Sequence, residues 1–194
     1  MSASIDENKI KRAVKDILIG INENPNREGL RETPKRVTTA WQKLTEGYSR
    51  NLKDEIKVFE NSSSYNDIII SGRIEFFSTC EHHLLPFFGH VYIGYVPGDT
   101  IIGLSKLSRA VDIYARRLQD QERITVQIAD EIMGLLKPKG VAVYIEAKHF
   151  CNMVRGVEKK DSNMITMIFR GVLERDDFQK KFLSVVNSFN RSDA

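Results

Sequence analysis

Two short segments of this sequence carry the side chains that zinc prefers as ligands. The first is Cys80–His83, with the sequence CEHH, and the second, about seventy residues later, is His149–Cys151, with the sequence HFC. Together they hold both cysteines of the chain and three of its four histidines. A zinc ion with three protein ligands keeps an open position where chemistry can take place. The sequence therefore predicts one metal site built from both segments.

The spacing within each segment indicates how the ligands would converge. Cys80 and His83 are three residues apart, a distance that one turn of loop can wrap around an ion. His149 and Cys151 follow the apolar run 141–145, and on a strand residues two apart point to the same face of the sheet. We therefore expect two chelating pairs, one from a loop and one from the end of a strand.

Other interpretations stay open on the residues alone. The two cysteines could form a disulfide, be unrelated buried thiols, or belong to a closed structural zinc site. Residues 1–11 are polar and mixed in charge and do not resemble a signal peptide, which indicates a reducing, cytoplasmic compartment where a structural disulfide is rare. The adjacent His82 and His83 leave the backbone in different directions, so that one could bind metal while the other acts as acid or base. His149 offers the same choice beside Cys151.

A second candidate site begins where a helix is predicted to start. In Gly103–Arg109 (GLSKLSR), Ser105 is predicted to cap the helix, with Lys106 in its first turn and Arg109 about one turn further on. The free N–H groups and the dipole at a helix start attract anions, and the two cations would strengthen the attraction for a phosphate chain. The glycine spacing of a P-loop is absent. A solvated basic face is the alternative interpretation.

Further polar residues could complete a nucleotide site. Gln121 and Glu122 lie near the junction of two predicted helices, and a buried carboxylate beside an amide could bind the N1–H and amino edge of guanine. A capped, salt-bridged helix start is the more ordinary explanation of such a pair. Arg155, four residues after Cys151, would place a guanidinium near the metal, or else lie on the surface. His90 is interpreted as structural.

Hydrophobic periodicity supplies the elements that would position these residues. Helices are predicted over 4–23, from Thr33 towards Gly47, from Ser105 to Leu118, from Ile124 to Leu136, and over 177–188. Strands are predicted over 68–77, 90–96, 141–149 and 164–174, with 60–64 as a polar linker. This order favours an α+β fold in which helices are segregated from a largely antiparallel sheet.

Length and composition limit the possible partners. A chain of 194 residues, with 41% hydrophobic and 28% charged residues, is typical of one globular domain, here with a helical extension. The formal net charge of +3 is weak and no long basic run occurs, so that no nucleic-acid partner is expected. No apolar stretch approaches the length of a membrane span, so that no membrane partner is expected either.

Taken together, these motifs resemble the GTP cyclohydrolase I family. The resemblance runs from about residue 5 to the C-terminus, and its most specific strings are CEHHLLPF and GLSKL in this order. The matching segments are Thr33–Val37, Cys80–Phe87, Gly103–Leu107, Ala115–Gln119, Gln121–Arg123, Glu146–Cys151 and Arg155–Val157.

Site roles follow from the resemblance, position by position. The implied zinc ligands are Cys80, His83 and Cys151. The implied catalytic, proton-transferring residues are His82, His149 and Ser105. The implied substrate-binding residues are Lys106, Arg109 and Arg155 for the triphosphate and ribose, where Ser105 would also lie, and Gln121 and Glu122 for the guanine.

The resemblance also implies an activity and an architecture. The activity is zinc-dependent hydrolysis of GTP at C8, with release of formate, ribose rearrangement and closure to 7,8-dihydroneopterin triphosphate, the first step of tetrahydrofolate and pterin biosynthesis. The architecture is a tunnelling fold (T-fold) with a four-stranded antiparallel sheet, two central helices and an N-terminal helical extension. We expect a helical region over 1–60 and a catalytic domain over 61–194. The family's sheets join between subunits into a barrel, usually as a homodecamer.

Two rival hypotheses differ in chemistry. A related tunnelling-fold enzyme, such as the nitrile reductase of queuosine synthesis, would use a cysteine nucleophile and NADPH and would not need this set of cysteines and histidines. A catalytically silent nucleotide-binding or scaffold protein would hold a structural zinc that small chelators cannot reach and that GTP does not affect.

Overall fold

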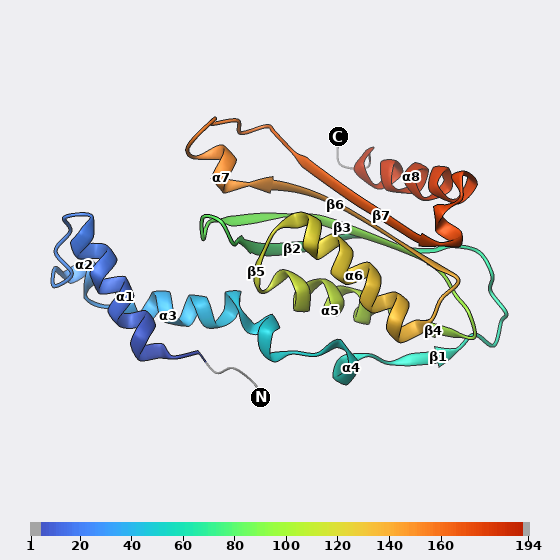
Figure 1. Cartoon of the computed structure of the whole chain (residues 1–194), viewed down its shortest axis with the longest axis horizontal. Coiled ribbons are helices and arrows are strands. Elements are labelled where there is room, and N and C mark those ends of the chain that lie inside the picture. Colours follow the sequence, from blue (N-terminus) through green and yellow to red (C-terminus); the bar gives the residue numbers. More distant parts are fainter. Residues whose placement is uncertain (1–4, 192–194) are drawn as a thin grey trace.

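The structure is a computed structural model and describes residues 5–191. Its elements confirm a mixed α+β chain in which a curled sheet lies between helices, with an N-terminal group of helices projecting to one side (Figure 1). The predicted helix over 4–23 is observed as α1, Glu7–Gly20, and residue 4 lies outside the described part. The Asp6 carboxylate caps α1 by accepting from the backbone N–H of Lys9.

The N-terminal region continues through three further helices and a 3-10 turn. They are α2 (Glu28–Arg31), α3 (Thr33–Leu44), η1 (Glu46–Ser49) and α4 (Leu52–Glu55). The helix predicted from Thr33 is observed as α3, with Glu32 in the cap position, and it ends at Leu44, before Gly47. Leu52 of α4 is buried against Ala110 and Ile113, and the N–H of Gly47 in η1 donates to the Arg116 carbonyl, so that α4 and η1 both join this region to the rest of the fold.

Four long strands pair in antiparallel fashion, in the order β2-β3-β6-β7. They are β2 (Ile69–Cys80), β3 (Pro86–Val96), β6 (Gly140–His149) and β7 (Met164–Gly171). A bulge between Ser71 and Ile74 interrupts the pairing of β2 with β3, and Arg73 within it has a φ of 52°. The alternation along these strands sends one set of side chains to each face of the sheet.

The sheet differs from the four-stranded prediction by a fifth, two-residue strand. β5 (Leu118–Gln119) pairs in parallel with Thr79 and Cys80 at the end of β2. A separate pair joins β1 (Val58–Glu60) to β4 (Thr100–Ile102). Short strands escaped prediction because two or three residues carry no measurable alternation. The proposed division near residue 60 stays a prediction, although β1 pairs across it.

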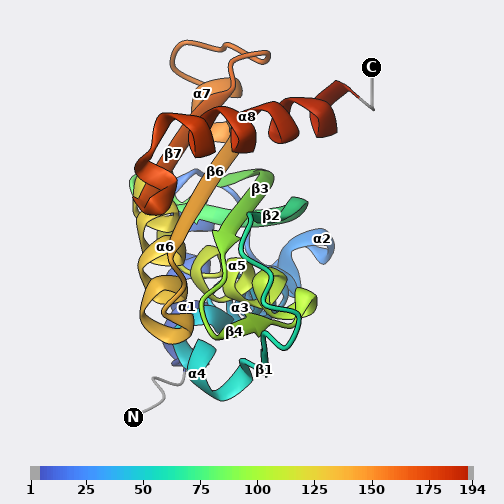
Figure 2. The same ribbon diagram turned by 90° about the vertical axis from the view of Figure 1, so that its right-hand side faces the viewer.

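Helices cover both faces of the sheet (Figures 1 and 2). α5 (Leu104–Ala115) and α6 (Gln121–Leu136) lie on one face, where Val111 and Ile128 pack with Ile93 and Val143 in the main core. α8 (Asp176–Arg191) lies on the other face, over Tyr92 and Tyr144. The last predicted strand ends early because the 3-10 turn η2 (Val172–Glu174) follows β7. No helix among residues 5–191 is long and apolar enough to span a membrane.

Candidate active site

Two chain segments meet at one end of the sheet, on the face that α5 and α6 cover. Cys80 is the last residue of β2, and a tight turn follows it, in which the N–H of Leu84 donates to the Cys80 carbonyl at 2.9 Å. The N–H of Cys80 in turn donates to the Leu85 carbonyl at 2.8 Å. Cys151 arrives from β6, but not on the strand as predicted. β6 ends at His149, and Cys151 lies in the short helix α7 (Phe150–Met153).

The side chains of Cys80, His83 and Cys151 form a compact cluster whose ligand atoms all lie within 4.8 Å of one another. Both cysteines are free thiols, which rules out the disulfide interpretation for this structure. Cys80 Sγ lies 3.6 Å from His83 Nδ1. Ligands about 2.1–2.3 Å from a tetrahedral ion stand roughly 3.4–3.8 Å apart, so this spacing fits a metal site.

The surroundings of the cluster favour the metal-binding form of His83 but not that of Cys151. Desolvation lowers the pKa of His83, and the guanidinium of Arg155 adds to this effect, so that the imidazole stays neutral and free to bind. Burial raises the pKa of the Cys151 thiol, as does the neighbouring Cys80, whereas Arg155 lowers it. A bound cation would reverse the effect of burial, because it stabilises the thiolate.

His82 stands beside the cluster without being one of its three members. Its Nδ1 lies 3.9 Å from Cys80 Sγ, and its side chain is 64% exposed. Glu81, whose Oε1 is 3.9 Å from His82 Nε2, is itself held by a two-pronged ion pair with Arg123. This ion pair lowers the pKa of Glu81, and the resulting carboxylate faces His82.

His149 is half-buried and held from two directions. Its ring stacks on Phe87, with ring centroids 4.5 Å apart and planes 6° apart. Its Nε2 lies 2.9 Å from Oε1 of Gln121. Burial lowers the pKa of His149, while the nearby carboxylate of Glu122 raises it. His149 thus lies two residues from Cys151 but is not one of the three clustered side chains.

The two residues predicted to bind guanine differ in their exposure to solvent. Gln121 has no exposed surface, and its amide contacts β6, β7 and His149. Glu122 is exposed, contrary to the buried carboxylate that the sequence suggested. A cavity of about 240 Å³ lies between Glu122, Thr125 and Thr166. The Glu122 side chain thus lines an open cavity and lies near enough to His149 to raise its pKa, whereas the Gln121 side chain is enclosed.

The predicted phosphate-binding residues are not gathered at this end of the molecule. Ser105, Lys106 and Arg109 lie in the first half of α5, whereas its C-terminal end leads into β5 beside Cys80 (Figure 1). A 12-residue helix is about 18 Å long, so most of its length separates Ser105 and Lys106 from this end, and about half of its length separates Arg109 from it. Gly103 caps α5 in place of the predicted Ser105. Arg155 is exposed but close enough to His83 and Cys151 to affect both.

Several residues with clear contacts at the site were not predicted. Phe87 supports the ring of His149, Thr166 accepts from Gln121 at 3.1 Å, and Glu55 contacts Arg109 at 3.2 Å. Alternation does place Phe87 and His149 on one face of their strands. The register that makes them direct partners, however, is a property of the pairing and not of either strand alone.

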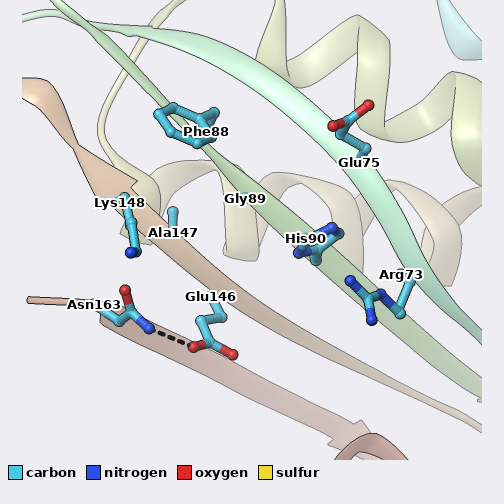
Figure 3. A pocket seen from close by; sticks show the side chains of 9 residues that line it. All are labelled: Arg73, Glu75, Phe88, Gly89, His90, Glu146, Ala147, Lys148 and Asn163. Atoms are coloured by element: carbon cyan, nitrogen blue, oxygen red, sulfur yellow. Dashed lines mark hydrogen bonds between the residues drawn. The ribbon is translucent and has the colours of Figure 1, made fainter. Parts of the chain in front are cut away.

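A groove of about 400 Å³ lies on the opposite face of the sheet (Figure 3). In it His90 is the direct cross-strand partner of Glu75 and of Glu146, and Arg73 and Lys148 add positive charge. None of the candidate site residues lines this groove. His90 is thus a member of a charged row, and the cluster of Cys80 lies behind the sheet from it.

Comparison with known proteins decides the family. The family model described as GTP cyclohydrolase I matches residues 10–187, which is most of the chain. The chain belongs to the GTP cyclohydrolase I family. The strings CEHHLLPF and GLSKL, on which the resemblance was based, both lie inside the matched range.

Individual relatives in the GTP cyclohydrolase I family extend the match to nearly full length. A GTP cyclohydrolase 1 of Coxiella burnetii is 48% identical over 92% of this chain and 98% of its own. One of Campylobacter jejuni is 46% identical over 94% of this chain and 96% of its own. A third, of a Nostoc species, is 46% identical over 94% of this chain and 85% of its own. Among solved structures, an apo archaeosine synthase QueF-Like shows a partial likeness, with 14% sequence identity and a TM-score of 0.46. The likeness covers 54% of this chain and 94% of that chain.

Proposed function

We propose that this protein is a zinc-dependent GTP cyclohydrolase I that converts GTP and water to formate and 7,8-dihydroneopterin triphosphate. This reaction would be the first step of tetrahydrofolate and pterin biosynthesis, in the cytoplasm. The observation that carries the proposal is the Cys80–His83–Cys151 cluster in a chain of this family. Two free thiols in one site suit a reducing compartment.

The donor set supports zinc as the metal. Two thiols and one imidazole are ligands typical of Zn2+, and three protein ligands leave a fourth position open. When bound, zinc supplies Lewis acidity and a water that is nucleophilic at neutral pH. Cys80, His83 and Cys151 would hold it, and the exposed side of His83 leaves the site accessible to a substrate.

The remaining residues have roles that their positions support. His82 and His149 flank the cluster and would move protons to and from the imidazole ring of the base as it opens. The exposed Glu122 carboxylate beside His149 would hold the guanine edge. Arg155 lies near the cluster and would bind the ribose or triphosphate. Ser105 would assist proton transfers while the ribose rearranges.

Distance within the chain supports a site that is shared between subunits. Ser105 and Lys106 lie in the first turn of α5, whose opposite end leads into β5 beside Cys80, so that most of a helix about 18 Å long separates them from that end. The tunnelling fold and homodecamer implied by the family would bring the start of one α5 to the cluster of a neighbouring subunit. The outer edge of β7, and the part of β2 before its pairing with β5 at Thr79 and Cys80, have no neighbouring strand among residues 5–191 and suit such an assembly.

The decisive experiment supplies GTP to the zinc-loaded protein and follows formate release and pterin absorbance. Cys151→Ser is measured alongside, with its zinc content. We expect both products from the parent, and loss of zinc and of both products in the variant, because a single missing thiolate dismantles a three-ligand site. Formate without pterin would place the block after hydrolysis.

Two outcomes would favour other functions. If the zinc-loaded parent released neither formate nor pterin, the assignment of GTP as substrate would be wrong. Zinc that resists small chelators and is indifferent to GTP would favour a structural metal in a silent binding protein. A His149→Ala protein with full activity would remove the acid–base role from His149 but leave the reaction assignment intact.

A further inference from the structure

The side-chain amide of Gln121 is fully buried, and the groups around it fix its orientation. Its Nε2 lies 3.2 Å from the carbonyl oxygen of Ile145 and 3.0 Å from that of Met164. Carbonyl oxygens only accept hydrogen bonds, so the NH2 end of the amide must face them. A flipped amide would set its oxygen against two carbonyl oxygens and leave all three without a donor.

Two threonines close the same network. The hydroxyl of Thr125 donates to the backbone carbonyl of Gln121 at 2.8 Å. Because that hydrogen is already used, Thr166 must be the donor in its 2.7 Å contact with Thr125. The Thr166 oxygen is then free to accept from Gln121 Nε2 at 3.1 Å. Each hydroxyl hydrogen of the two threonines then has one consistent place, and the acceptors around Nε2 outnumber its two hydrogens, which reinforces the amide orientation.

The other end of the amide faces a histidine. Oε1 of Gln121 lies 2.9 Å from Nε2 of His149 and can only accept, so Nε2 must carry the hydrogen. The stacked ring of Phe87 holds the plane of the imidazole. A neutral imidazole with its hydrogen on Nε2 has its lone pair on Nδ1.

We propose that Gln121 is a positioning residue that fixes His149 as the Nε2–H tautomer, so that His149 exchanges protons with the substrate through Nδ1 alone. The tautomer follows from the contacts of this chain, while the exchange with substrate rests on the proposed function. This role replaces guanine binding for the Gln121 side chain, which is buried and already occupied.

The fixed tautomer sets an order of events. Neutral His149 has no hydrogen on Nδ1, and its Nε2 hydrogen points into a buried amide. In this neutral form it can therefore act only as a base, accepting a proton at Nδ1 from water or a substrate hydroxyl. The imidazolium then returns that same proton to a nitrogen of the opening base, and the ring is again the neutral Nε2–H form.

The tautomer is tested on the parent protein by solid-state 15N NMR of the zinc-loaded, histidine-labelled chain. The His149 signals are identified by their loss in His149→Gln. We expect a pyrrole-type signal from Nε2 and a pyridine-type signal from Nδ1. The reverse assignment, or an even mixture of tautomers, would overturn the proposal. This measurement is independent of whether GTP is the substrate.

The positioning role is tested by kinetics of Gln121→Met. We expect kcat to fall by about tenfold or more with KM for GTP within about twofold, because the proton transfer is disturbed and binding is not. A raised KM with unchanged kcat would return Gln121 to guanine binding. Gln127→Met is the matched control, since it removes another amide contact of α6, the 2.7 Å bond from Gln119, away from His149, and should keep kcat.

Failure of this inference is distinguishable from failure of the proposed function. If the parent makes no formate from GTP, the kinetics of Gln121→Met cannot be measured, but the NMR result still decides the tautomer. If Gln121→Met does not fold, the same NMR result stands alone. Parent activity together with a hydrogen on Nδ1 would refute the inference and leave the cyclohydrolase intact.

Discussion

The imidazole of His149 depends on an aromatic ring as well as on an amide. Phe87 has no exposed surface and stacks on His149, while its edge meets Phe76 at 5.8 Å. A flat ring on one side restricts rotation of the imidazole about its long axis. At the scale of single residues, the orientation of His149 therefore depends on neighbours that would not themselves react.

The variant Phe87→Leu tests whether Phe87 affects catalysis through His149 in addition to stabilising the fold. We expect a loss of roughly 1–2 kcal/mol in the free energy of unfolding, because buried aromatic volume is removed. We also expect kcat to fall several-fold, since leucine cannot stack on the imidazole. Urea unfolding and steady-state kinetics measure the two effects.

Phe76→Leu is the matched control for this change. Phe76 is 1% exposed and packs in the same core, but its ring stands against Phe87, whereas the ring of His149 stacks on Phe87. A similar loss of stability with unchanged kcat would show that stacking, and not general loosening, is responsible. Equal losses of kcat in both variants would contradict the supporting role of Phe87.

Among the elements, α4 binds the start of the chain to α5. Glu55 of α4 accepts from Nε and Nη2 of Arg50, each at 2.8 Å, and from Nη1 of Arg109 at 3.2 Å. Hydrogen bonds from Arg50, and then from Arg109, lower the pKa of Glu55 from 4.5 to about 2. The carboxylate thus joins α4 to a residue proposed to bind the triphosphate.

Glu55→Gln should reveal this contact through its pH dependence. A carboxyl whose pKa is lower in the folded state stabilises the fold above its unfolded pKa, and this contribution disappears as pH falls through the folded value. We expect the variant to be less stable than the parent by about 1 kcal/mol at pH 7, given partial exposure. The difference should shrink between pH 4.5 and about 2.

Urea unfolding at pH 7 and at pH 3 measures the Glu55 effect. Asp130→Asn serves as a comparison, because Asp130 pairs with Arg170 on the surface, where its side chain is 54% exposed. That variant should differ little from the parent at either pH. A Glu55→Gln deficit that stayed constant across both pH values would argue against the ion pair as its cause.

The sequence predicted elements well where periodicity is long and poorly where position depends on neighbours. α6 ends at Leu136, before Pro138, as predicted, and its start is capped by the Asp120 carboxylate. Cys151 was misplaced because the strand ends two residues earlier, at a helical turn that no alternation signals. The buried amide of Gln121 was beyond prediction, since its partners come from β6 and β7.

Across the whole molecule, the two groups of residues proposed to form one site lie at different places in the same chain. The cluster of Cys80 lies at one end of the sheet, and Lys106 begins a helix that reaches this end only at its other terminus. Ile165 and Met167, on the outer strand β7, are about half exposed. An assembly that covers this edge would remove exposed apolar surface and bring the two parts together.

Subunit mixing tests this sharing. Cys151→Ser and Lys106→Ala chains should each have little activity alone, one lacking the metal site and the other a phosphate ligand. Co-expressed in equal amounts, they should regain about a quarter of parental activity, because that fraction of shared sites draws both intact residues from different copies. Activity of purified mixed oligomers measures the effect, and a mixture no better than its components would place each site within one chain.

The joining of Cys80 and Cys151 has a consequence for the lifetime of the protein. The two thiols are roughly seventy residues apart along the chain, so an ion held by both acts as a removable cross-link that only the folded chain can form. Ion binding must then draw the folding equilibrium towards the native state, by an amount that grows with the logarithm of free ion concentration. Metal supply would thereby govern abundance as well as turnover, since chains that lack the ion open more often and are exposed to proteolysis.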